Sequence, residues 1–225
     1  MAPLTLPKMV LIDLDGTLVD SVPDLAWCVD EMMKGVGLES HGEARVRHWV
    51  GNGVERLVCR ALTNSLDGEP EAALFERAFP LFSELYAENS SQRSQLYPGV
   101  IEGLEWLKGQ PLRVGCVTNK AERYTLPILA DLGIADYFEI VVSGDTLAVK
   151  KPDPAPLLHV SDHFGLRPAE AAMIGDSMSD VKAARAAGFS IICMSYGYNH
   201  GEDIRDYSPD AVIDSMAELP TLFVR

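Results

Sequence analysis

The chain contains 225 residues, of which 47% are hydrophobic and 23% are charged, so its composition is that of an ordinary globular protein. Its formal net charge is −14, and a polyanion repels both nucleic acid and anionic membrane surfaces. We therefore expect no nucleic acid and no membrane as partners, and an anionic substrate would need local cations or a metal in its site.

The first predicted element is a buried strand at residues 9–12, and the sequence DLDGT follows it directly. Asp13 and Asp15 are unexpected at the end of a buried strand, because carboxylates are costly to remove from water. One interpretation is that the strand ends here and Thr17 caps a helix. The other is that the two acids hold a metal and react with a substrate. For the acid pair alone, the first interpretation is favoured.

A helical insertion follows this strand. Almost a hundred residues separate Asp15 from the next strand pattern at Leu112, whereas a strand–helix–strand unit needs about 30. The surplus is helical in pattern. We therefore predict a cap domain at residues 21–93, inserted into a core domain that is formed by residues 1–20 and 94–225.

Punctuating residues divide this insertion into separate helices. Ser21 and Pro23 are typical of a helix start. The sequence GNG at residues 51–53 separates two further helical patterns, and Pro70 opens a fourth. We expect Pro80 to kink that last helix, because proline removes a backbone hydrogen bond and clashes with the preceding turn.

Short apolar runs predict further strands at residues 114–117, 140–142, 172–174, 191–194 and 212–213. Helical patterns lie between several of them, at residues 99–108, 155–164 and 178–187. Strands that alternate with helices indicate a doubly wound α/β fold with a mainly parallel sheet, which is a Rossmann-like core. In such folds the ligand lies at the carboxyl ends of the strands.

Polar residues follow two of these later strands, and a lysine stands in a loop between them. One strand is followed by Thr118 and Asn119, Lys151 stands before a proline, and another strand is followed by GDSMSD, which contains Asp176 and Asp180. Each group is weak by itself, because turns contain threonine and asparagine and surface lysines are usually solvated. An acid pair, a hydroxyl, a lysine and a second acid pair in this order are hard to explain by chance.

These four motifs resemble those of the haloacid dehalogenase-like hydrolases, and the resemblance covers the whole chain. It implies hydrolysis of a phosphate ester by an aspartate nucleophile, with Mg²⁺ as the cofactor. The stretches HWVGNGVERLV, SGDTL, KPDPAPLLHV and SYGYNHGEDI resemble more narrowly those of the phosphoglycolate phosphatases. The resemblance therefore implies a small phosphorylated metabolite as substrate, and 2-phosphoglycolate before others.

The same resemblance gives the two opening acids different roles. Asp13 is expected to attack phosphorus and to form an aspartyl phosphate. Asp15 is expected to protonate the leaving oxygen and then to deprotonate the hydrolytic water. Mg²⁺ would be held by the Asp13 side chain, the Asp15 backbone carbonyl and the Asp176 side chain, which are the hard oxygen ligands that this ion prefers.

The remaining motif residues are expected to bind the phosphoryl group. The resemblance places Thr118 and the backbone amide of Asn119 on its oxygens, and Lys151 beside the transferring group. Asp180 is expected to orient Lys151 or a metal-bound water. Lys150 does not stand directly before the proline, so we expect it to be a solvated neighbour.

The leaving group is expected to contact the GNG loop of the cap. The backbone amides of Gly51, Asn52 and Gly53 could contact an anion there. Arg47, or one of the other arginines near the loop, could pair with a substrate carboxylate. These other arginines are Arg45, Arg56 and Arg60.

Several other polar residues are given no part in the chemistry. We expect Asp20 and Asp24 to be solvated acids or acids at the start of a helix. The histidines expected to be structural or surface residues are His48, His159, His163 and His200. The four cysteines lack any CxxC spacing, so we expect free thiols in a cytoplasmic protein.

Enzymes with similar motifs catalyse other reactions, and some of these are alternatives to hydrolysis of 2-phosphoglycolate. A dehalogenase needs no acid at the position of Asp15, because a halide leaves without a proton. A capped sugar phosphomutase shares every motif and stays open as the alternative, together with phosphatases of other small phosphorylated metabolites. A signalling module with a phospho-accepting aspartate is a remote alternative, because such a module is shorter and has no cap.

Overall fold

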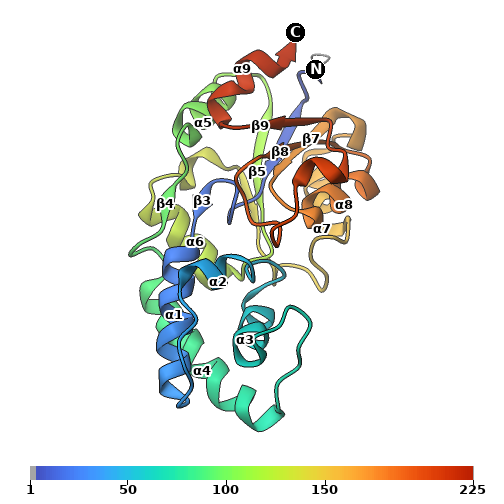
Figure 1. The fold of residues 1–225 in the computed structure, drawn as a ribbon. Coiled ribbons are helices and arrows are strands. Elements are labelled where there is room, and N and C mark those ends of the chain that lie inside the picture. Colours follow the sequence, from blue (N-terminus) through green and yellow to red (C-terminus); the bar gives the residue numbers. More distant parts are fainter. Residues whose placement is uncertain (1–3, 225) are drawn as a thin grey trace.

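The computed structural model describes residues 4–224, so the first three residues and the last residue of the predicted core domain lie outside the described residues. Six parallel strands form its central sheet (Figure 1). In spatial order they are β6 (Ile140–Val142), β5 (Arg113–Val117), β2 (Met9–Ile12), β7 (Ala171–Gly175), β8 (Ser190–Met194) and β9 (Ala211–Ile213). All of the strands predicted from the sequence are present, and their ends agree to within one residue.

Strand β2 lies in the middle of the sheet, where the strand order reverses. It pairs with β5 on one side and with β7 on the other, so that Leu11 lies opposite both Gly115 and Met173. The chain fills one half of the sheet with β5 and β6 and then the other half with β7, β8 and β9. A ligand site is therefore expected just beyond the carboxyl end of β2.

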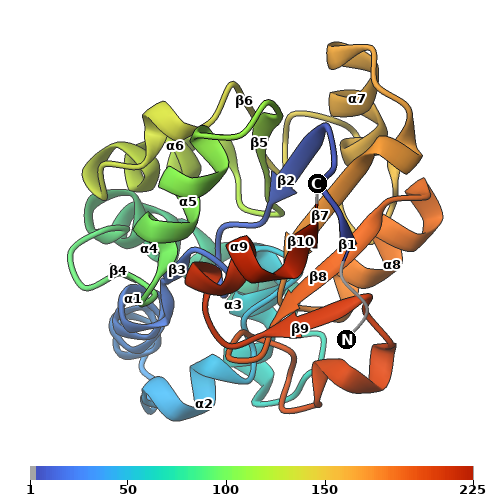
Figure 2. The same ribbon diagram turned by 90° about the horizontal axis from the view of Figure 1, so that it is seen from above.

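Helices cover both faces of the sheet (Figure 2). They are α5 (Val100–Lys108), α6 (Glu122–Asp131), α7 (Ala155–Phe164), α8 (Met178–Ala187) and α9 (Leu219–Leu222). Val10 and Ile12 of β2 pack in one apolar core with α5, α6 and α9, whereas Met9 and Leu11 pack in another with α7 and α8. Alternate side chains of a strand point to opposite faces, so this arrangement confirms the predicted doubly wound α/β fold.

Short elements complete the described part of the chain. The parallel strands β1 (Leu4–Thr5) and β10 (Phe223–Val224) pair with each other, as do the antiparallel strands β3 (Val19–Asp20) and β4 (Gln95–Leu96). Turns of 3₁₀ helix lie at Ala135–Tyr137, Pro168–Glu170, Ile204–Tyr207 and Met216–Glu218. The β3–β4 pair joins the segment that leaves the sheet to the segment that returns to it.

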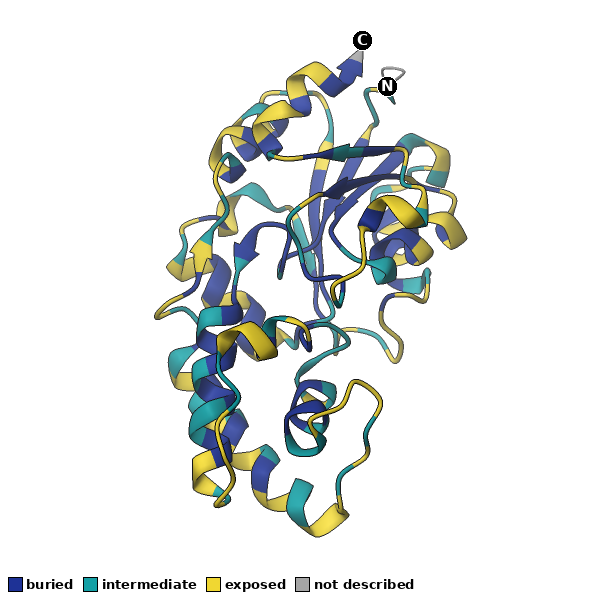
Figure 3. Ribbon diagram, viewed as in Figure 1, coloured by how far each residue is buried: buried dark blue, intermediate teal, exposed yellow. Residues whose placement is uncertain are grey.

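Between β3 and β4 the chain forms a helical layer of its own. Its helices are α1 (Val22–Gly35), α2 (Glu43–Arg47), α3 (Val54–Thr63) and α4 (Ala72–Asn89). Their buried residues, which are dark blue in Figure 3, form an apolar cluster that includes Met32, Val46, Leu57 and Phe82. These helices lie within residues 21–93, and the division of the chain into a core and a cap domain stays a prediction.

Two helices contain a proline in their interior. Helix α4 begins two residues after Pro70 and continues through Pro80 to its end. Helix α6, which we did not predict, contains Pro127, and its neighbours Ile128 and Leu129 are buried against the sheet. Burial of these apolar side chains offsets the hydrogen bond that the proline removes. None of the described helices is long and apolar enough to cross a membrane.

Of the two acids near the start of α1, Asp24 is not solvated, which corrects that part of the expectation from the sequence. The Asp24 side chain is fully buried and accepts hydrogen bonds from the backbone amides of Arg93 and Ser94 and from the Ser94 hydroxyl. Asp20 is partly buried and binds Arg47 and Tyr198. Both acids lie near a helix start as expected, but partners that are distant in sequence remove Asp24 from water.

Candidate active site

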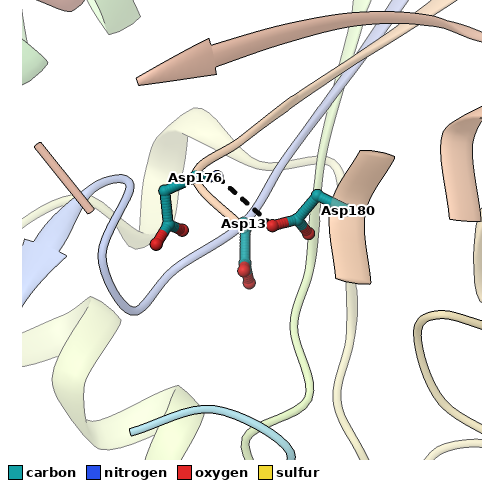
Figure 4. Close-up of side chains that lie close together, drawn as sticks. All are labelled: Asp13, Asp176 and Asp180. Carbon is teal, nitrogen blue, oxygen red and sulfur yellow. Dashed lines mark hydrogen bonds between the residues drawn. The ribbon is translucent and has the colours of Figure 1, made fainter. Parts of the chain in front are cut away.

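Three aspartates meet at the carboxyl edge of the sheet (Figure 4). Asp13 follows β2, Asp176 follows β7, and Asp180 lies in the first turn of α8. Each offers one carboxylate oxygen, and these oxygens all lie within 4.8 Å of one another. The fold therefore brings together acids from two of the predicted motifs, at the position where the strand order reverses.

A buried lysine lies beside these acids. The loop after β6 carries Lys151, whose side chain is 1% exposed. Its ammonium Nζ lies 2.9 Å from Asp13 Oδ1 and 2.7 Å from Asp180 Oδ1, and it donates to the Val117 carbonyl at 2.7 Å. All three N–H groups of the ammonium are therefore used, and its charge is held next to Asp13.

Asp180 is occupied on both of its carboxylate oxygens. Oδ1 accepts from Lys151, while Oδ2 accepts from the backbone amide of Ser177 at 3.1 Å and from the Ser177 hydroxyl at 2.7 Å. The contact with the Ser177 amide is one half of a capping box at the start of α8. Because both of its oxygens already accept hydrogen bonds, Asp180 is better suited to position Lys151 than to coordinate a cation.

Burial changes the protonation of these groups. Removal from water raises the pKa of Asp13 to about 7, although the ammonium of Lys151 opposes the shift. The pKa of Asp176 is raised well above its usual range, first by burial and then by the charges of Asp180 and Asp13. Burial would lower the pKa of Lys151, but the two carboxylates beside it raise it. Three carboxylates thus lie close together beside one ammonium, which contacts two of them, and a further cation would offset the excess negative charge.

The available oxygens fit a small divalent cation. Among the described residues, none donates a hydrogen bond to Asp13 Oδ2. Asp176 accepts one hydrogen bond on each oxygen, from the Thr17 hydroxyl at 2.8 Å and from the Tyr198 amide at 2.5 Å, so each oxygen keeps a lone pair. Carboxylate oxygens are the ligands that Mg²⁺ prefers, and this donor set suits it.

Two glycines leave room for the Asp176 carboxylate. Gly16 has a φ of +84°, and a Cβ atom there would lie 2.3 Å from Asp176 Oδ2. A Cβ atom on Gly197 would lie 2.1 Å from the Cβ of Asp176. The glycine of the DLDGT motif is thus required both by its backbone conformation and by the close approach of a carboxylate from another strand.

Asp15 is paired with a lysine to which the sequence gave no role. The Lys120 ammonium lies 2.9 Å from Asp15 Oδ1 and 2.8 Å from Oδ2, and the Lys120 side chain is 2% exposed. Its Nζ also lies 4.9 Å from the centre of the Tyr86 ring of α4. Lys120 stands directly after Thr118 and Asn119, at the end of β5. This position could have identified it from the sequence as a further residue of the site.

The phosphoryl-binding residues expected from the sequence lie at the same edge. Thr118 is buried and Asn119 donates from its side chain to the Lys151 carbonyl at 2.8 Å. Both residues line the same cavity as Asp13 and Lys151. Lys150 is exposed, as expected for a solvated neighbour.

This cavity lies between the sheet edge and the helical layer. It encloses about 800 Å³ of empty space, part of which is open to solvent. The sheet side contributes Asp13, Asp15, Asp176, Lys120 and Lys151, and the helical layer contributes Leu25, Leu57 and the residues 50–54. The GNG loop therefore lines the cavity, and its three residues all have positive φ angles.

The structure does not bring Arg47 into the cavity, which corrects its assignment as a substrate-binding residue. Its guanidinium donates to Asp20 at 3.1 Å and to Glu43 at 2.9 Å. Arg60 instead supports the GNG loop, because it donates to the Gly51 carbonyl at 3.2 Å and to the Asn52 side chain at 3.0 Å. No arginine is among the described residues that line the cavity.

The loop after β8 also reaches the cavity, through residues that were not expected there. Tyr198, Asn199 and His200 line it, although His200 was expected to be a structural or surface residue. Its ring atom Nδ1 lies 2.8 Å from the His48 carbonyl of the helical layer. The stretch SYGYNHG contains all three residues, and only its resemblance to known enzymes marked it.

The chain is similar to a described family and to several named proteins. Residues 10–194 match the family described as haloacid dehalogenase-like hydrolase. The phosphoglycolate phosphatase of Nitrosococcus oceani is 65% identical over 216 residues, which are 96% of this chain and 96% of that protein. The phosphoglycolate phosphatase of Thiobacillus denitrificans is 47% identical over 218 residues, which are 97% of this chain and 96% of that protein.

A solved structure shows the same fold. It is the crystal structure of a predicted phosphoglycolate phosphatase from Haemophilus somnus, which is 37% identical and has a TM-score of 0.91. The similarity covers 96% of this chain and 98% of that chain, so it includes both the sheet and the helical layer.

Proposed function

This chain belongs to the haloacid dehalogenase-like hydrolases, and we propose that it hydrolyses 2-phosphoglycolate to glycolate and phosphate. The observation that carries the proposal is the position of Asp13. It is buried at the reversal of the strand order, between the ammonium of Lys151 and the carboxylate of Asp176. A nucleophile, a fixed cation and a metal ligand thus meet at one point, and the relatives of 65% and 47% identity support the choice of substrate.

Three oxygen donors would hold Mg²⁺ in this site. They are the Asp13 carboxylate, the Asp15 backbone carbonyl and the Asp176 carboxylate. When bound, Mg²⁺ supplies the positive charge that lets an anionic nucleophile approach an anionic phosphate. Asp180 is left to hold Lys151, because both of its oxygens already accept hydrogen bonds.

In the first step, a carboxylate oxygen of Asp13 attacks phosphorus and an aspartyl phosphate forms. The bond from phosphorus to the glycolate oxygen breaks, and Asp15 gives its proton to that oxygen. Lys151 and Thr118 stabilise the charge of the transferring group, together with the backbone amide of Asn119.

In the second step, Asp15 acts as a base. It takes a proton from a water molecule as that water attacks phosphorus, and the bond from phosphorus to Asp13 breaks. Inorganic phosphate leaves and the Asp13 carboxylate is regenerated. One acid therefore moves the proton in both directions, which explains why a second carboxylate stands two residues after the nucleophile.

We propose that residues 21–93 act as a cap domain over this site. The support is the cavity, which is lined from the sheet side by the acids and from the helical side by Leu25, Leu57 and the GNG loop. A cap of this kind excludes other water molecules and selects the leaving group. A cytoplasmic location is supported by the four free cysteines, three of which are buried.

A panel of phosphate monoesters tests the proposal. The panel contains 2-phosphoglycolate, 3-phosphoglycerate, glycerol 3-phosphate and two hexose phosphates, and release of phosphate gives kcat/KM for each. We expect the highest value for 2-phosphoglycolate. A higher value for a hexose phosphate, or interconversion of hexose phosphates without release of phosphate, would replace the proposal with the phosphomutase alternative. Asp13→Asn is the inactive control.

A further inference from the structure

Lys150, the exposed neighbour of Lys151, reaches the GNG loop of the helical layer. A Cβ atom added at Gly53 would lie 3.0 Å from the Lys150 Nζ and 3.9 Å from the backbone carbonyl oxygen of Asn119. Both Gly53 and Asn119 line the cavity. The Lys150 ammonium therefore lies at the rim of the cavity, where the helical layer and the end of β5 approach each other.

Lys150 differs from the two buried lysines of the site, because it has no acid beside it. Lys151 uses its three N–H groups within the site, and Lys120 contacts both oxygens of Asp15. Among the ion pairs of residues 4–224, none involves Lys150. The charges of the buried lysines are thus committed to carboxylates of the protein, whereas the charge of Lys150 is available to a ligand.

The GNG loop offers further donors at the same rim. Within residues 4–224, no backbone carbonyl accepts a hydrogen bond from the amides of Asn52 and Gly53. An anion that reaches this point gains amide donors from the helical layer and an ammonium from the sheet side. Hydrogen bonds between charged groups are roughly twice as strong as those between neutral groups, so the ammonium is the stronger of these two contributions.

The distance between the rim and the phosphoryl site suits a short leaving group. In 2-phosphoglycolate a single methylene separates the ester oxygen from the carboxylate, so the carboxylate stays close to the phosphoryl group. The amide of Asn119 is expected to bind a phosphoryl oxygen, and the Asn119 carbonyl and the Lys150 Nζ both lie within 4 Å of one point beside Gly53. The flexible stem of a lysine lets its ammonium follow a ligand over short distances.

We propose that Lys150 is a specificity-determining residue, whose ammonium binds the carboxylate of the leaving group at the rim beside Gly53. The inference rests on the proposed function, because the substrate named there carries an acid next to its ester. Lys150 takes no part in breaking the bond to phosphorus. It favours phosphate esters whose alcohol carries a carboxylate over esters of neutral alcohols.

The test compares 2-phosphoglycolate with ethyl phosphate, which has a similar size but lacks the carboxylate. The quantity measured is the preference, defined as the ratio of the two kcat/KM values. For Lys150→Met we expect the preference to fall by about 10-fold, which is at the low end for a hydrogen bond between charged groups because Lys150 is exposed. The loss should appear in KM for 2-phosphoglycolate, since the carboxylate is bound equally before and during the reaction.

Two further variants and the salt concentration complete the experiment. Lys150→Arg keeps a cation and should retain most of the preference. Lys108→Met removes an exposed lysine at the end of α5, which lies toward the amino end of β5, and should leave the preference unchanged. Salt screens charges at the surface, so rising ionic strength should lower the preference of the wild type more than that of Lys150→Met.

The outcomes separate the two proposals. An unchanged preference in Lys150→Met, an equal loss for both substrates, or the same fall in Lys108→Met overturns the inference about Lys150 and leaves the phosphatase in place. A wild-type enzyme that does not hydrolyse 2-phosphoglycolate overturns the proposed function itself.

Discussion

Asp24 and Ser94 are 70 residues apart in sequence, yet the buried Asp24 carboxylate accepts hydrogen bonds from both the amide and the hydroxyl of Ser94, at 2.8 and 2.7 Å. Asp24 lies in the first turn of α1, which follows the segment that leaves the sheet. Ser94 and Arg93 belong to the segment that returns to it. One carboxylate therefore links, by hydrogen bonds, the two connections between the sheet and the helical layer.

Removal of this carboxylate is expected to destabilise the protein. Asp24→Ala leaves the amides of Arg93 and Ser94 without acceptors, so we expect the free energy of unfolding to fall by about 3 kcal/mol. Ser94→Ala removes one hydroxyl contact and should cost about 1 kcal/mol. Urea denaturation measures both values. The exposed Glu55 is the control, and Glu55→Ala should change stability by less than about 0.5 kcal/mol. A loss for Asp24→Ala no larger than that of the control would contradict the assignment.

A pair of glycine variants separates backbone strain from damage to the metal site. Gly16 and Gly37 have similar φ angles, +84° and +81°. A Cβ atom added at Gly16 would clash with Asp176, whereas a Cβ atom added at Gly37 would have no atom within 4 Å. Both alanine variants should therefore lose about 1 to 2 kcal/mol of stability from the strained backbone. We expect only Gly16→Ala to lose activity, by about 100-fold or more, because it displaces Asp176, the proposed metal ligand. Equal activities in the two variants at a temperature where both are folded would count against the role of Asp176.

Removal of the metal should abolish turnover. We expect activity to vanish in excess chelator and to return with Mg²⁺, whereas Ca²⁺ should support it poorly because it prefers more ligands and looser geometry. Release of phosphate from 2-phosphoglycolate measures all three conditions. Full turnover in excess chelator would overturn the metal assignment for Asp13, Asp15 and Asp176.

Amide variants of the two opening acids should fail at different steps. Asp13→Asn removes the nucleophile, so no covalent intermediate should form. Asp15→Asn keeps the backbone carbonyl and the nucleophile but loses the proton transfer, which is typically worth about 10² to 10⁴-fold. With p-nitrophenyl phosphate the first step needs little protonation, so aspartyl phosphate should accumulate on Asp15→Asn. Borohydride would trap it at position 13, and a label found at another residue would contradict the mechanism.

The strands could be predicted because their signal is local. Buried parallel strands are short apolar runs, and all of the predicted strands are present within one residue at each end. Helix α6 was missed, since Pro127 interrupts a short helical pattern and only packing against the sheet compensates for it. A sequence pattern does not reveal that packing.

The residues of the site also divide into those with a local sequence signal and those whose partners are distant in sequence. Asp13, Asp176 and Lys151 belong to short motifs, and the order of those motifs along an α/β chain predicts that they meet at one edge of the sheet. Lys120 was given no role and the burial of Asp24 was not foreseen, because their partners are 105 and up to 70 residues away in sequence. Arg47 was misplaced for a related reason: proximity in sequence to the GNG loop does not determine which way a helix face points.

The central position of β2 has a consequence for the newly made chain. Its neighbours β5 and β7 are both synthesised long after it, on the far side of the helical insertion. At the usual rate of translation, on the order of ten seconds pass between the emergence of Asp13 and that of Asp176. During this interval Asp13, the proposed nucleophile, has neither its sheet partners nor the proposed metal ligand Asp176 beside it. Under the proposed mechanism, a nascent chain on the ribosome therefore cannot attack phosphate esters until most of its length has been made.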